Sequence, residues 1–111
     1  MKNESENARL ERLLNMQQNQ PNDVFLHYAL ALEWMKTGAA EKAIGALQRV
    51  IQLDPGYLAA YFQLGHLLLD QENKEEAILI FERGIEKAQE VKDLKTLAEL
   101  KNALLNAQIE D

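Results

Sequence analysis

The side chains that could perform chemistry are few and widely spaced in this 111-residue chain. Its only serine and threonine hydroxyls belong to Ser5, Thr37 and Thr96, and it has no cysteine. A hydroxyl nucleophile needs a neighbouring base, and no catalytic dyad or triad can be assembled from these residues with the two histidines, His27 and His66. The sequence therefore predicts that the protein is not an enzyme.

Binding of a metal or an organic cofactor is not expected either. His66 has no second histidine three or four residues away on the same helical pattern, and the chain has no cysteine. Glycine-rich loops of the kind that bind phosphate groups are missing from the sequence.

The charge balance of the chain bears on its partners. Twelve basic residues stand against 18 acidic ones, which gives a net charge of −6 at pH 7. This charge repels nucleic acids and anionic membrane surfaces, so we expect neither as a partner. The longest apolar runs, such as residues 78–81, are far too short to cross a bilayer, and residues 1–14 contain no secretion signal. We expect a cytoplasmic protein, which the lack of cysteine permits.

Two prolines mark an internal repeat. Pro21 and Pro55 are 34 residues apart, and each stands between two helical patterns. When the chain is shifted by 34 residues, the two segments match in the size and character of their side chains. The matched pairs include His27 with Tyr61, Tyr28 with Phe62, Leu30 with Leu64, Ala31 with Gly65, Trp34 with Leu68, Ala43 with Ala77 and Leu47 with Phe81. A register kept over this length indicates two copies of one structural unit.

Each unit has the hydrophobic period of two amphipathic helices, with apolar residues three and four positions apart. Breaks between the helices are predicted at Gly38, which suits a left-handed turn, and at the segment 54–56, which contains a proline and a glycine. Asn73 is predicted to cap the following helix while the Glu76 side chain reaches back to it. The pattern predicts helices near residues 23–37, 40–53, 57–71 and 74–90.

Helical patterns also flank the two units. Residues 4–19 match the second helix of a unit whose first helix is missing, since Leu13 falls in register with Leu47. Residues 94–109 fall where a third unit would begin, but Glu99 stands in register with Gly65, as expected of a capping helix with one solvated face. The prediction is a single domain, 1–111, with an N-terminal helix, two repeats and a C-terminal cap at residues 4–19, 22–55, 56–90 and 92–109.

With these residues the chain resembles the tetratricopeptide repeat family, whose 34-residue unit pairs two helices. The first unit offers His27, Leu30, Ala31, Trp34, Ala43, Leu47, Val50 and Pro55, and the second offers Tyr61, Leu64, Gly65, Leu68, Ala77, Phe81 and Gly84. Gln89 replaces the second closing proline, which predicts a less sharp junction before the last helix. The resemblance implies an all-α fold of six helices, a right-handed α-α superhelix, that serves as a protein-interaction module.

The residues that carry the resemblance account for packing. Small side chains at Gly65 and Ala77 let paired helices approach closely, and Trp34, Leu47 and Phe81 fill the space between them. His27 takes one of these packing positions, so we interpret it as a core residue.

The resemblance also implies a binding site, because the first helices of successive units line the concave side in this family. The predicted site is an apolar groove for a partner polypeptide, formed by Phe25, Tyr28, Leu32, Met35, Phe62, His66 and Leu69. Ala59 and, from the last helix, Thr96, Leu100 and Ala103 would complete it. Phe25, Tyr28, Leu32 and Met35 form a second apolar stripe on the first helix of the first repeat, separate from the stripe of Leu30 and Trp34. A surface helix that packs on one side only would not need this second stripe.

Three ways of covering this stripe stay open. The last helix of the chain could cover it, a partner protein or peptide could bind it, or two copies could bury it in a homodimer.

Some members of the family grip a C-terminal carboxylate with a cluster of Lys, Asn and Arg. The matching positions hold Tyr28, Leu32, Gln63, Asp93 and Leu97. An adaptor for chaperone tails is therefore not expected.

Overall fold

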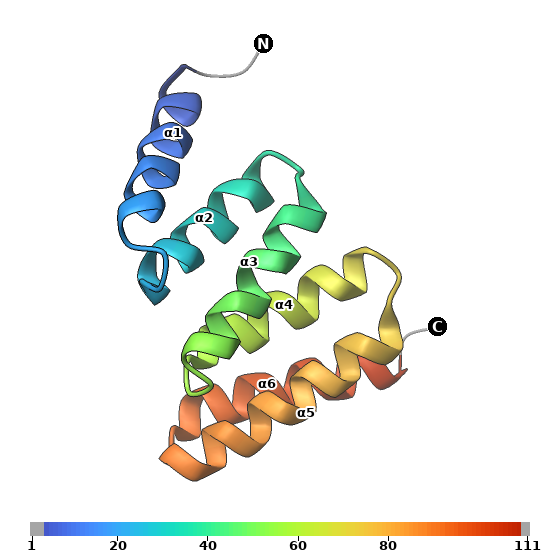
Figure 1. Ribbon diagram of the computed structural model, residues 1–111. Coiled ribbons are helices and arrows are strands. Elements are labelled where there is room, and N and C mark those ends of the chain that lie inside the picture. The colour runs from blue at the N-terminus through green and yellow to red at the C-terminus, as the bar shows by residue number, and fades with distance from the viewer. Residues whose placement is uncertain (1–3, 110–111) are drawn as a thin grey trace. The chain divides into compact units, whose positions relative to one another are not determined.

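Six α-helices and no strand make up the part of the chain that the computed structural model describes, residues 4–109. Side chains are described from Ala8 to Ile109. The helices are α1 (Glu4–Asn19), α2 (Val24–Lys36), α3 (Ala40–Leu53), α4 (Leu58–Asp70), α5 (Lys74–Val91) and α6 (Leu94–Ile109) (Figure 1). Each helix begins and ends within one residue of the helix predicted from the sequence.

The chain divides into two compact units, Met1–Leu53 and Asp54–Asp111. The first unit contains α1 to α3 and the second contains α4 to α6. Short turns join the paired helices, residues 37–39 between α2 and α3 and residues 71–73 between α4 and α5 (Figure 1). Because these turns are short, the two helices of each pair, α2 with α3 and α4 with α5, lie side by side and bury their apolar stripes against each other.

The core of the first unit has two parts, one on each side of α2. Between α1 and α2 lies a cluster of apolar side chains, Leu10, Leu13, Leu14, Leu26, Ala29, Leu30 and Trp34. On the other side of α2, Ala31 and the α3 residues Ala43 and Leu47 have no exposed surface. Helix α2 is therefore packed on two sides, and α1 covers the side that α3 leaves open.

A buried ion pair adds a polar contact between α1 and α2 that the sequence analysis did not predict. Glu33 is only 3% exposed, and its Oε1 lies 2.7 Å from Arg9 Nε and 3.4 Å from Lys36 Nζ. The Arg9 side chain remains 57% exposed, so its charge stays partly hydrated while it neutralises the carboxylate. Because a buried carboxylate is costly without a partner, this pair favours the arrangement in which Glu33 faces α1.

Equivalent side chains of the two repeats make the same hydrogen bond. His27 Nε2 donates to the carbonyl oxygen of Pro21 at 2.7 Å, and the Tyr61 hydroxyl donates to the carbonyl oxygen of Pro55. Since a carbonyl only accepts, His27 carries a proton on Nε2, and its Nδ1 accepts from the Gln17 amide at 3.1 Å. Burial raises the pKa of the Tyr61 hydroxyl, which keeps it protonated as a donor. His27 is thus a core residue, as predicted, with both ring nitrogens satisfied.

The core of the second unit depends on two glycines. A methyl group at Gly65 of α4 would overlap the ring of Phe81, which is fully buried. A methyl group at Gly84 of α5 would lie 2.8 Å from Tyr61 Cβ and 3.1 Å from Leu100 Cδ1. Phe81 therefore packs directly on the backbone of α4, and at Gly84 the backbone of α5 lies close to both α4 and α6.

Two helix ends differ from the prediction. Asn73 Oδ1 accepts from the Glu76 backbone N–H at 3.4 Å, as expected of a cap, but the Asn73 N–H donates to the Leu68 carbonyl and not to the Glu76 side chain. The junction between α5 and α6, which lacks the closing proline, is tight, although a less sharp junction was predicted there. There, Lys92 adopts a left-handed conformation with φ 59°, and α6 begins directly after Asp93. A left-handed C-terminal residue reverses the chain without a proline.

Replacing Gly65 with alanine tests the close contact between α4 and α5. Alanine is favoured over glycine within a helix by about 1 kcal/mol, but its methyl group would overlap the buried Phe81 ring. We expect G65A to lower the free energy of unfolding by about 1–3 kcal/mol, because the core becomes overpacked. Urea unfolding followed by circular dichroism measures this change.

The first repeat supplies a compensating substitution. It holds Ala31 and Leu47 at the positions of Gly65 and Phe81, so the double variant G65A/F81L should recover much of the stability that each single variant loses. Losses that simply add in the double variant would contradict the close contact.

Candidate functional site

One side of α4 stays partly open at the surface of the second unit. The buried side chains of this helix include Tyr61 and Leu64, whereas three residues of the predicted site, Phe62, His66 and Leu69, are half-buried. These three side chains follow helical spacing along one stripe. Helix α4 is therefore apolar both where it packs into the core and where it meets solvent.

His66 is held between two phenylalanines. Its ring centroid lies 4.5 Å from that of Phe62, with 58° between the ring planes, and 5.3 Å from that of Phe81, in an edge-to-face arrangement. Tilted and edge-to-face geometries are favourable for aromatic rings. Since Phe81 belongs to the buried core, it anchors the aromatic surface that His66 and Phe62 present.

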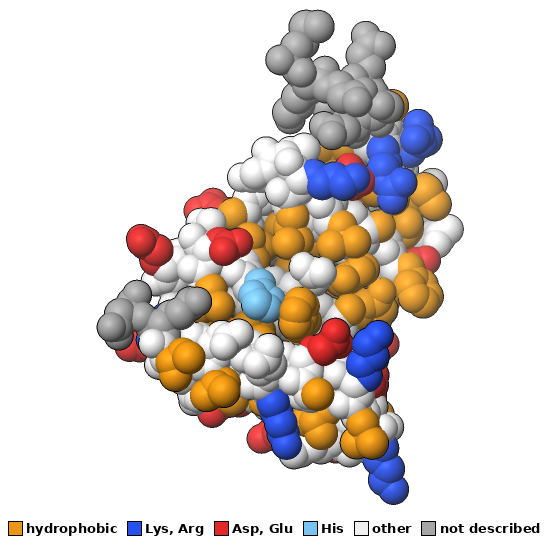
Figure 2. Space-filling model, turned by 180° about the vertical axis from the view of Figure 1, so that it is seen from behind, with side chains coloured by type: hydrophobic (Ala, Val, Ile, Leu, Met, Phe, Trp, Pro, Cys, Tyr) orange, Lys and Arg blue, Asp and Glu red, His pale blue; other side chains and the backbone are white. Residues whose placement is uncertain are grey.

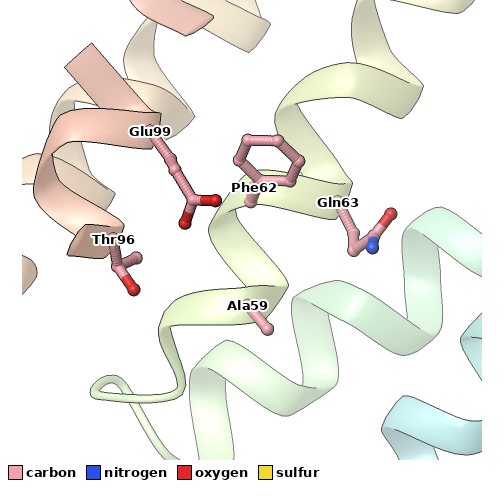
Figure 3. Close-up of a pocket in the computed structure, with 5 residues that line it drawn as sticks. All are labelled: Ala59, Phe62, Gln63, Thr96 and Glu99. Atoms are coloured by element: carbon pink, nitrogen blue, oxygen red, sulfur yellow. The ribbon is translucent and has the colours of Figure 1, made fainter. Parts of the chain in front are cut away.

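Two adjoining pockets lie between α4 and α6, and we call them together the α4–α6 groove. The first, of about 170 Å³, is lined by Ala59, Phe62, Gln63, Thr96 and Glu99 (Figure 3). The second, of about 200 Å³, is lined by Phe62, His66, Glu99, Asn102, Ala103 and Asn106. Phe62 and Glu99 line both pockets, so they face each other across the middle of the groove.

The α6 side of the groove differs from the prediction. Leu100, which was expected to line the site, is fully buried and lies close to Gly84 of α5. Thr96 and Ala103 do line the groove, but Glu99, Asn102 and Asn106 also contribute to it. The groove therefore has an aromatic side on α4 and a largely polar side on α6. Their helical spacing was the one signal in the sequence that could have placed these three polar residues in the groove. Such a row of polar residues usually indicates a solvated face.

The volumes of the pockets bear on what they could hold. Pockets that bind drug-sized molecules or cofactors measure roughly 300–1,000 Å³. At about 170 and 200 Å³, the two pockets of the groove are smaller than that range. Their size suits single side chains of a bound segment.

The other four predicted site residues lie on α2 in the first unit. Phe25 is 73% exposed, and Tyr28, Leu32 and Met35 are half-buried. Helical spacing places them along one side of α2. The structure thus groups Phe62 with His66 on the α4–α6 groove and the remaining residues along α2, while Leu69 lies outside both pockets.

Hydrophobic side chains reach the surface of the chain at many places, and Figure 2 shows them among acidic and basic side chains on the face it draws. Outside the predicted site, the large exposed apolar residues include Leu79 on α5 and Leu94, Leu105 and Ile109 on α6. The solvated face predicted for the capping helix is therefore mixed, with apolar residues next to polar ones.

Within residues 4–109, no helix is both long enough and apolar enough to span a membrane. Among the side chains from Ala8 to Ile109, no group of three or more His, Asp or Glu is arranged to hold a metal ion.

Comparison with known families decides the relationship of the chain. The family described as tetratricopeptide repeat matches residues 35–103, which is more than half of the sequence. The chain belongs to the tetratricopeptide repeat family. A tetratricopeptide repeat domain protein from Salinibacter ruber, solved by NMR, is 36% identical, with a TM-score of 0.76 over 81% of this chain and 92% of that one. No curated protein matches the chain.

More distant tetratricopeptide structures share the fold. The TPR2B domain of yeast Sti1, solved in a complex with pHsp70, has a TM-score of 0.84 at 17% identity and covers 95% of this chain and 84% of that one. At this identity the likeness concerns the fold alone. The family and the all-helical tetratricopeptide fold predicted from the sequence are confirmed. This fold is generally a module for protein–protein interaction.

Asp93 fixes the start of α6 and with it the position of Thr96 in the groove. One carboxylate oxygen of Asp93 accepts the Thr96 backbone N–H at 3.0 Å, and the other accepts the Thr96 hydroxyl at 2.8 Å. These bonds, the backbone one first, lower the pKa of Asp93 below its ordinary value of 3.8. A carboxyl whose pKa is lowered by folding stabilises the fold above its ordinary pKa, and this contribution is lost as the pH falls through the lowered value.

The variant D93N tests this cap, because asparagine keeps an acceptor but lacks the charge. Near neutral pH we expect D93N to unfold at a lower temperature than the parent chain. Below pH 3.8 the gap should close progressively, as Asp93 of the parent chain becomes protonated. Thermal unfolding followed by circular dichroism over this range measures the gap. A gap of constant size at all pH values would show that the charge of Asp93 has no such role.

Proposed function

We propose that this chain is a protein-interaction module that binds a partner polypeptide through two apolar surfaces. One is the α2 stripe of the first unit, formed by Phe25, Tyr28, Leu32 and Met35, and the other is the α4–α6 groove of the second unit. The residues in contact with the partner would be Phe25, Tyr28, Leu32, Met35, Phe62, His66 and Leu69. The observation that carries the proposal is the place of Phe62, a half-buried aromatic ring that lines two open side-chain-sized pockets.

The composition of these surfaces supports this function. Phenylalanine, tyrosine and methionine offer large apolar contact areas, and methionine adapts its shape to a partner. On α2 the exposed Phe25 ring adds to this area in the first unit. Burial of such side chains on binding removes apolar surface from water, which is the main favourable contribution to most protein–protein association.

We further propose that the chain binds without catalysis and without a cofactor, in the cytoplasm. The argument from the residues is that its one serine and two threonines lie far apart in sequence and that it has no thiol. Thr96, the hydroxyl residue in the groove, donates its proton to Asp93 and is therefore not placed as a nucleophile.

The double variant Y28A/F62A tests the proposed function in a quantitative pull-down from the native cell extract. We expect it to lose at least about tenfold in the capture of specific partners, because it removes an aromatic anchor from each surface. Its helicity and the cooperativity of its unfolding should remain close to those of the parent chain. The matched control is L79A/L105A, which removes apolar surface from two residues that are each 54% exposed and lie outside the groove.

Two results would contradict the proposal. The first is normal capture by Y28A/F62A, or an equal loss by the control. The second is a stable dimer in solution, measured by light scattering over a range of concentrations, that Y28A/F62A converts to a monomer. This second result would assign the same side chains to a homodimer interface instead.

A further inference from the structure

The α6 side of the groove carries hydrogen-bonding groups that the chain itself does not use. Among the residues that the structure describes, the side chains of Glu99, Asn102 and Asn106 form no hydrogen bond or ion pair. Thr96 differs, because its hydroxyl is bonded to Asp93. Three polar groups of this groove are thus available to a ligand.

Among the described residues, Glu99 is the one charged residue that lines either pocket. Lys95 precedes it by one helical turn, but it lines neither pocket and makes no ion pair with Glu99. The carboxylate of Glu99 points from α6 into the space in front of α4, on the same side as the Phe62 ring (Figure 3). The middle of the groove therefore combines an unpaired negative charge with an aromatic face.

These two features together favour a cation. The face of an aromatic ring attracts positive charge, and a carboxylate pairs with the same charge through strong hydrogen bonds. An arginine guanidinium can satisfy both at once, because it is flat enough to stack on the ring and has several donors for the carboxylate. An acidic ligand would be repelled by Glu99 and would find no Lys or Arg among the described residues that line either pocket.

We propose that the α4–α6 groove recognises a partner segment in which an arginine or lysine stands beside an apolar residue. The cationic side chain lies between Phe62 and Glu99 in the first pocket. The apolar side chain packs on Phe62 and His66 in the second. The amides of Asn102 and Asn106 pair with the backbone of the segment, since an amide can donate and accept at once. This inference rests on the proposed function and names the chemistry of the partner.

The net charge of the chain, −6, agrees in sign with this choice. A basic segment is attracted to the protein over a distance before contact is made, and this attraction weakens as salt is added. The specific discrimination comes from Glu99, which is in direct contact with the cation.

Selection from a library of random 12-residue peptides displayed on phage tests the inference. The baits are the parent chain, E99Q, F62A and the control E82Q, which removes the same charge from an exposed residue of α5. Peptides selected on the parent chain and on E82Q should be enriched in arginine or lysine next to an apolar residue. Peptides selected on E99Q should lack this enrichment, although E99Q is isosteric and should unfold like the parent chain.

A selected peptide is then synthesised in two forms, one with its arginine and one with neutral citrulline. The citrulline form should bind the parent chain about tenfold more weakly, because it loses the charge recognised by Phe62 and Glu99. On E99Q the difference between the two forms should be much smaller, because only the Phe62 ring remains to recognise the charge. Fluorescence anisotropy measures both affinities for each protein.

The outcomes separate this inference from the function on which it rests. Peptides that need Phe62 but show no enrichment in cations, or that bind equally well with citrulline, would overturn the inference and leave the groove as a binding site. Peptides that bind F62A as well as the parent chain would overturn the groove itself. A selection that yields no binding peptide would count against both.

Discussion

Packing of the Phe81 ring on the backbone of Gly65 is the contact on which the second unit depends. Because Gly65 has no side chain, α5 can place a fully buried aromatic ring directly against α4. The next residue along α4, His66, rests with its ring edge-to-face on the same phenylalanine, 5.3 Å away. The contact that builds the core therefore also orients the aromatic side of the groove.

A second close approach sets the opposite side of the groove. At Gly84 there is no room for a methyl group between α5, Tyr61 of α4 and Leu100 of α6. Leu100 is thereby buried, and its neighbours Glu99 and Asn102 line the groove that Phe62 borders. The first unit keeps the same plan with Ala31 and Leu47, both fully buried, in place of Gly65 and Phe81. The size of each small residue is matched to the large residue it faces.

The sequence predicted the helices, the family and the core role of His27, because these follow from local spacing. Apolar residues three and four positions apart locate the helices, and the 34-residue register locates the repeats. The left-handed turn was also predicted at Gly38, which has φ 80°. The left-handed residues Glu72, which is the counterpart of Gly38 in the second repeat with φ 61°, and Lys92 were missed, because a residue with a side chain rarely adopts that conformation.

The polar half of the groove could not be predicted in the same way. Extending the 34-residue register to α6 assigned Leu100 to the site, but packing at Gly84 buries it. A row containing Glu99, Asn102 and Asn106 on a terminal helix has the same pattern as a solvated face, and only tertiary structure places it opposite Phe62. The buried ion pair of Glu33 was also missed, although the sequence contains a signal for it. Glu33 continues the buried stripe of Leu26 and Leu30, and a charged residue in such a stripe can indicate a buried ion pair.

We propose that a partner binds the surface that these contacts form on α4 and α6. An NMR titration of the ¹⁵N-labelled chain, with a peptide selected for binding to it, tests this most directly. We expect the largest changes in amide chemical shift at Phe62, His66, Glu99 and Asn102, with little change at the exposed Leu79 of α5. Changes concentrated instead at Leu94, Leu105 and Ile109, the exposed apolar residues of α6 outside the groove, would contradict it.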